Sequence, residues 1–203
     1  MKSFAFLALA VVTSAAHAVV YSNGPVTSGF NSSGAPISIL QSTSLGQGTL
    51  GFGHQANLGN RVADNFSVTG GGWIVSRISF FAYQTNATAF SFTGADAQIV
   101  SGLDPNAGSS MLNLVNSPVS NGGVAGYRVT ETTLDNLQRP IYRVDITGLN
   151  LNLAAGDYMM KWGLYGSLAS GPWAPPVAPY SAGDGFQSLT NGAYNPALDG
   201  GTG

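Results

Sequence analysis

Apolar side chains alternate with polar ones along much of the chain after residue 60, and this period of two constrains the fold more than any other feature. The clearest set, Tyr158, Met160, Trp162 and Leu164, occupies one face of an extended segment. An apolar stripe at helical spacing never exceeds two turns. Comparable extended segments, rich in β-branched and aromatic residues, cover 62–68, 73–83, 97–100, 124–133 and 141–153. The sequence therefore predicts an all-β fold.

Turn residues separate these segments, which favours two antiparallel sheets packed face to face. We predict a jelly-roll-like sandwich of about eight strands over residues 61–203, with a Gly/Pro-rich C-terminal loop region. Residues 105–121 are predicted to form a polar loop. The strongest core candidate is 73–83, whose apolar residues fall on both parities. That strand is either covered on both faces or interrupted by a β-bulge.

The first sixty residues divide into two parts. Residues 1–18 match a secretory signal peptide, with a basic start, an apolar run and a cleavage site at Ala16-His17-Ala18. We expect cleavage there, a secreted or cell-surface location, and no transmembrane segment in the mature chain. Residues 19–60 are interpreted as an N-terminal strand and a Gly/Ser/Asn-rich arm. This arm either packs loosely on the surface, which we favour, or is donated as a strand to another subunit.

Charged residues make up 8% of the sequence, against about 25% in typical domains. A surface built from Ser, Thr, Asn, Gln and Gly tolerates contact with polysaccharide or with copies of itself, because little charge opposes it. The Lys and Arg residues form no basic stripe, which excludes nucleic-acid binding. The absence of Cys excludes thiolate metal sites and cysteine nucleophiles.

Residues able to move protons are scarce. After the predicted cleavage site the one histidine is His54, interpreted as an exposed loop residue. The one glutamate, Glu131, is placed on the wet face of a predicted strand. Neither shows a partner for a catalytic triad or for the paired carboxylates of a glycosidase. We therefore predict no enzymatic activity.

One candidate cofactor is a structural calcium ion, which prefers carboxylate, amide and carbonyl oxygens in loops. The surroundings of the candidate ligands do not match the twelve-residue calcium loop of EF-hands, and no other cofactor is predicted. The candidate calcium ligands are Asp64, Asp104, Asn106 and Asp184.

Aromatic side chains offer a candidate glycan-binding surface, because their faces stack on sugar rings. Trp73 and Trp162 lie within predicted strands and are expected in the core. Trp173 lies in a stiff Pro-rich loop, where exposure and hinge packing are equally favoured. If exposed, Trp173 would form a stacking surface with Tyr165 and Tyr180.

Several motifs together resemble a family of exported bacterial proteins that often carry a PEP-CTERM sorting tail. The motifs are VVYSNGP after the predicted cleavage site, VADNFSV, GWIVSRISFFAY, AAGDYMMKWGLYG and SGPW. The resemblance implies a β-sandwich ectodomain of exopolysaccharide-producing bacteria, with a role at the cell envelope or in the extracellular matrix and no catalytic residues. The chain departs from the family pattern, since it lacks the Val-Pro-Glu-Pro motif, the apolar helix and the terminal arginines.

Three hypotheses about function follow. The first is a non-enzymatic structural or interaction protein of the envelope or matrix. The second is a carbohydrate-binding module that uses Trp173 with Tyr165 or Tyr180. The third is a self-assembling fibre subunit that donates residues 19–45 to a neighbour.

Overall fold

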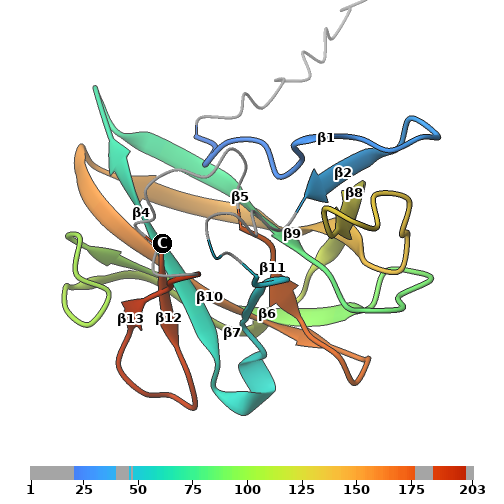
Figure 1. The fold of residues 1–203 in the computed structure, drawn as a ribbon. Coiled ribbons are helices and arrows are strands. Elements are labelled where there is room, and N and C mark those ends of the chain that lie inside the picture. Colours follow the sequence, from blue (N-terminus) through green and yellow to red (C-terminus); the bar gives the residue numbers. More distant parts are fainter. Residues whose placement is uncertain (1–20, 40–45, 47, 177–184, 200–203) are drawn as a thin grey trace, which may run out of the picture.

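The computed structural model describes residues 21–39, 46, 48–176 and 185–199, and these are almost entirely β-structure. Two sheets pack against each other, and a two-stranded ribbon contacts β5 of one sheet and β4 of the other (Figure 1). The strands are β1 (Gly29–Phe30), β2 (Pro36–Ile39), β3 (Phe52–Gly53), β4 (Arg61–Val68), β5 (Trp73–Ala82), β6 (Phe92–Ser101), β7 (Ser110–Ser117), β8 (Ser120–Val129), β9 (Pro140–Leu153), β10 (Gly156–Gly166), β11 (Trp173–Ala174), β12 (Phe186–Ser188) and β13 (Asn195–Pro196). The predicted all-β sandwich is confirmed, whereas the predicted signal peptide lies outside the described residues.

The five-stranded sheet has the order β1-β2-β8-β9-β5, and the six-stranded sheet has the order β13-β12-β4-β10-β6-β7. The pairs are antiparallel except for β2 with β8, which is parallel. The seven strands β4 to β10 each have eight or more residues, close to the predicted number. The jelly-roll connectivity stays a prediction. Within the described ranges we find no helix with the length and hydropathy needed to cross a bilayer.

The core lies between the two sheets, and β10 contributes residues to both of its main clusters. Tyr158, Met160, Trp162 and Leu164 all pack into it, which confirms the predicted inner face of this strand. Trp162 stacks on Phe80 of the opposite sheet, with 5.4 Å between ring centroids. Aromatic contacts of this kind add to the apolar burial that holds the sheets together.

A β-bulge in β5 explains why its apolar residues occupy both parities. Trp73 and Val75 pack against the core near the start of the strand, and Ile78 packs there further along. The pairing with β9 shifts between Val75 and Arg77, so the alternation changes face at that point. Ile74 consequently points outward and is 71% exposed. The structure confirms the bulge near the start of the strand and also shows cover on both faces near its end, where Phe81 packs against a separate cluster with Val26 and Ile141.

The predicted polar loop over 105–121 is wrong, because Ser110–Ser117 form β7, the last strand of the six-stranded sheet. Leu112 and Leu114 pack inward against the core, while Met111 and Val115 are exposed. The Ser and Asn residues between them gave the segment a loop-like composition. The period-two pattern was nevertheless present.

Part of the N-terminal arm is built into this chain's own sheet. β1 pairs with β2, and β2 pairs with β8, where Ile37 and Ser38 are buried. Tyr21 packs against the rings of Phe66 and Trp73 at the other side of the sandwich. Residues 29–39 therefore already have a sheet partner within the chain.

Candidate functional site

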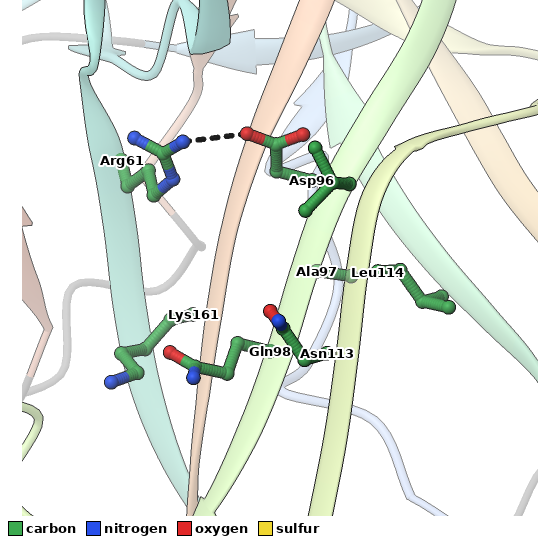
Figure 2. A pocket seen from close by; sticks show the side chains of 8 residues that line it. Arg61, Asp96, Ala97, Gln98, Asn113, Leu114 and Lys161 are labelled. Carbon is green, nitrogen blue, oxygen red and sulfur yellow. Dashed lines mark hydrogen bonds and ion pairs between the residues drawn. The ribbon is translucent and has the colours of Figure 1, made fainter. Parts of the chain in front are cut away.

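A small groove with a volume of about 80 Å³ lies on the outer face of the six-stranded sheet (Figure 2). Ala97 of β6 packs into the core, so its neighbours Asp96 and Gln98 face outward into the groove. The lining residues are Arg61, Asp96, Ala97, Gln98, Asn113, Leu114, Val115 and Lys161. They come from four adjacent strands, β4, β10, β6 and β7.

An ion pair closes one end of the groove. The Arg61 guanidinium donates from Nη2 to Asp96 Oδ2 at 2.6 Å, and from Nη1 to Asn191 Oδ1 at 3.1 Å. The second oxygen of Asp96 accepts a hydrogen bond from the backbone N–H of Asn116 at 2.8 Å. Asn116 has a φ of 46°, so this contact holds a left-handed residue beside a bulge of β7. Both oxygens of Asp96 are thus engaged in holding the fold.

A row of polar side chains crosses the rest of the groove. Gln98 stands opposite Lys161 of β10 on one side and opposite Asn113 of β7 on the other. Figure 2 shows Gln98 between the other two, below the ion pair. Neighbouring strands lie about 4.8 Å apart, so the three side chains are spaced evenly across the sheet.

The head of Lys161 is held by the loop after β6 and by the C-terminal segment. Its Nζ donates to the Pro105 carbonyl oxygen at 3.0 Å and lies 5.5 Å from the centre of the Tyr194 ring. Burial lowers the pKa of Lys161, and the negative charge of Asp104 opposes that shift. Burial also raises the pKa of Tyr194 to about 12. The lysine is therefore a fixed cation at the edge of the groove.

Of the three aromatic residues of the predicted glycan surface, Tyr165 and Trp173 lie within the described residues, where no ring contact joins them. Tyr165 lies beside the groove, where burial raises the pKa of its hydroxyl and the charge of Asp96 adds to the shift. Trp173 is half-buried instead in β11, where it packs near Tyr83 and its Nε1 donates to Ser170 Oγ at 3.2 Å. Trp173 is therefore packed in the two-stranded ribbon rather than fully exposed. Tyr180 lies outside the described residues.

The predicted calcium ligand Asp64 lies on β4, next to the N-terminal segment. Its carboxylate accepts hydrogen bonds from Asn23 Nδ2 and from the backbone N–H of Asn65. The hydroxyl of Tyr21 donates in turn to Asn23. These contacts tie the N-terminal segment to β4, which gives Asp64 a structural role.

Asp104 and Asn106 belong to one turn between β6 and β7. Asp104 Oδ1 accepts from the backbone N–H of Asn106 at 2.8 Å, and the Asn106 side chain exchanges two hydrogen bonds with the backbone of Tyr194. The nearby ammonium of Lys161 opposes a second cation at this turn. Asp184 lies outside the described residues. In the part of the chain that the structure describes, no three His, Asp or Glu side chains group as a metal site.

His54 is fully buried, so the prediction of an exposed loop histidine is wrong. Its backbone is paired on both sides, with its N–H donating to the Pro172 carbonyl and its carbonyl accepting from Leu164 N–H. Nδ1 lies 3.4 Å from the Phe52 carbonyl oxygen, and Nε2 has no hydrogen-bond partner among the described residues. Glu131 is exposed in the turn after β8 rather than on a strand face.

The sequence analysis did not predict the groove, although the alternating pattern already placed its polar residues on one side of their strands. Arg61, Gln98 and Lys161 each occupy an outward position of an alternating segment. Only the order β4-β10-β6-β7 brings them together, and strand order is a long-range property. Comparisons of the chain with protein-family models, curated proteins and solved structures find no match.

Proposed function

We propose that this chain is an exported, non-enzymatic interaction protein of the cell envelope or extracellular matrix, and that the groove binds polysaccharide. The row of Lys161, Gln98 and Asn113 carries this proposal. Side-chain amides both donate and accept hydrogen bonds, as sugar hydroxyls require. Because the three side chains stand on paired strands, their spacing is fixed before a ligand arrives.

The charges of the groove favour binding over catalysis. Of the eight described residues that line it, Asp96 is the one carboxylate, and both its oxygens are engaged. Glycoside hydrolysis needs two carboxylates about 5–10 Å apart, one of them able to give up a proton. His54 is buried in contact with the β3 and β10 backbone and does not line the groove. The groove is too small to enclose a ligand, so it would contact a sugar unit of a longer polymer along one face of that unit.

The groove is tested by replacing the residue at its centre. Gln98→Ala is expected to weaken polysaccharide binding about fivefold, because a sugar hydroxyl loses one hydrogen bond worth about 1 kcal/mol. The measurement is calorimetric titration with a panel of neutral and uronic-acid-containing exopolysaccharides. Asn150→Ala, an exposed amide on β9, is the matched control and should bind as the wild type does. Wild-type protein that binds none of the panel, or equal binding by Gln98→Ala, contradicts the proposal.

Export is tested separately. Expression of the full chain in a Gram-negative host should yield extracytoplasmic protein whose first residue is Val19, because Ala16 and Ala18 fit the signal-peptidase site. N-terminal sequencing of the fractionated protein gives the answer. Ala18→Tyr should block cleavage, since the peptidase requires a small residue there. Uncleaved wild-type protein retained in the cytoplasm would refute export.

A further inference from the structure

We propose that β7 is a self-association edge, through which two copies of this chain pair antiparallel about a twofold axis at Asn113. The proposal does not rest on polysaccharide binding, although Asn113, Leu114 and Val115 also line the groove. Among the described residues β7 pairs with β6 alone, which leaves its other edge open. An open edge exposes backbone N–H and C=O groups that can pair with another strand.

The side chains of β7 lack the charge and proline that protect many edge strands from pairing. Natural edges carry lysine, proline or inward-facing charge that prevents pairing between molecules. The eight residues of β7, S-M-L-N-L-V-N-S, include neither a charged residue nor a proline. Val115 is 72% exposed and Met111 is 43% exposed, so the outer face of this edge is apolar. Nothing in the strand repels a second copy.

The residue types of β7 are arranged symmetrically about Asn113, so two antiparallel copies centred on this residue bring like side chains together. Met111 of one copy then stands opposite Val115 of the other, on the outer face. On the inner face, Leu112 stands opposite Leu114, and both are partly buried already. Asn113 meets Asn113, where two amides can exchange hydrogen bonds. Every cross-strand pair is apolar with apolar or amide with amide, which stabilises an antiparallel ladder.

The same geometry limits the contact to a closed dimer. Leu112, Asn113 and Leu114 pair with β6 in regular register, and the register shifts on both sides of them. At one end, Asn116 has a left-handed backbone conformation. The intermolecular ladder is therefore confined to about residues 111–115. A twofold pairing uses the same edge of both copies and leaves none to propagate. A short ladder predicts a concentration-dependent dimer rather than a permanent one.

Sedimentation velocity of the wild-type protein without polysaccharide tests the association. Between about 10 µM and about 1 mM the wild type should shift from monomer to dimer. Val115→Lys should stay monomeric, because two lysines are brought to the paired edge and one stands opposite each Met111. Ile74→Lys is the matched control: Ile74 is 71% exposed on β5, the edge of the other sheet, and this variant should dimerise normally. Both positions face solvent, so both variants should keep the wild-type melting temperature.

The register is tested by a single introduced thiol, because the chain contains no Cys. Directly opposed Cα atoms in an antiparallel pair lie about 4.5–5.5 Å apart, within the range that a disulfide spans. Asn113→Cys should therefore form a disulfide-linked dimer under mild oxidation, whereas Asn152→Cys on β9 should not. A wild type that is monomeric at about 1 mM, a dimer that survives Val115→Lys, or a failure of Asn113→Cys to cross-link overturns the proposal.

Discussion

Replacing Arg128 with Ala is expected to lower the free energy of unfolding by about 3–5 kcal/mol. Arg128 is 1% exposed and lies on β8, opposite Ser38 of β2 in the parallel pair. Its Nη1 donates to Ser38 Oγ at 2.6 Å, and its Nε donates to the Leu50 carbonyl oxygen at 3.0 Å. Truncation removes the donor to the buried Ser38 hydroxyl, leaves the Leu50 carbonyl oxygen with the Tyr83 hydroxyl as a donor at 2.7 Å, and opens a cavity where the side chain packs.

The loss of stability in Arg128→Ala should be confined at first to the region around β2. Because β2 is short and depends on Arg128 and β8, amide exchange of Ile37 and Ile39 should accelerate before that of the central strands. Urea unfolding measures the free energy, and hydrogen exchange shows where protection is lost. Arg128→Met keeps much of the packed stem without the charge, so its cost should fall between those of wild type and Arg128→Ala.

Arg77→Ala is the control for removing an exposed arginine, since Arg77 is exposed on β5. It should change stability by less than about 0.5 kcal/mol. Equal losses from Arg128→Ala and Arg77→Ala would show that the buried guanidinium does not fasten the N-terminal arm to the sheet.

The features that the sequence predicted well depend on the alternation of side chains along a single strand. The inner face of β10 follows from the alternation of Tyr158, Met160, Trp162 and Leu164, and each of these residues packs into the core. Such a pattern reflects burial of one side of a strand, whatever its neighbours. The all-β architecture follows because several segments share this pattern.

What the sequence did not predict depends on pairing between distant segments. Arg128 is buried because Ser38, ninety positions away, stands beside it in the parallel β2–β8 pair. His54 is buried because the β10 backbone and the segment at Pro172 close over it. A charged or titratable residue is usually exposed unless it is paired, so local reasoning places both at the surface. The polar groove was missed for the same reason, since it needs the strand order.

His54 is expected to make the protein lose stability as pH falls from about 6.5 to about 4. Burial lowers the pKa of His54 from its ordinary value of 6.5 to about 4 in the folded protein. Between these two values the unfolded chain binds a proton that the folded chain does not, so unfolding is favoured progressively. The full loss is about 3 kcal/mol, because each unit of pKa difference corresponds to about 1.4 kcal/mol. Above pH 6.5 this contribution is constant, and below pH 4 it falls no further.

Between pH 6.5 and pH 5 the change in stability reports mainly on the protonation of His54, because most carboxylates titrate at lower pH. There the wild type should lose about 2 kcal/mol, measured by urea unfolding at each pH. His54→Phe keeps a ring of similar shape and carries no proton, so its stability should be nearly flat over the same range. The ring nitrogen that has no hydrogen-bond partner among the described residues, Nε2, is then replaced by carbon at little polar cost. Parallel slopes for the two proteins would mean that His54 is reached by solvent and titrates as an ordinary histidine. A flat line for His54→Phe beside a falling wild type would locate the acid sensitivity at one ring, enclosed by the β3 and β10 backbone.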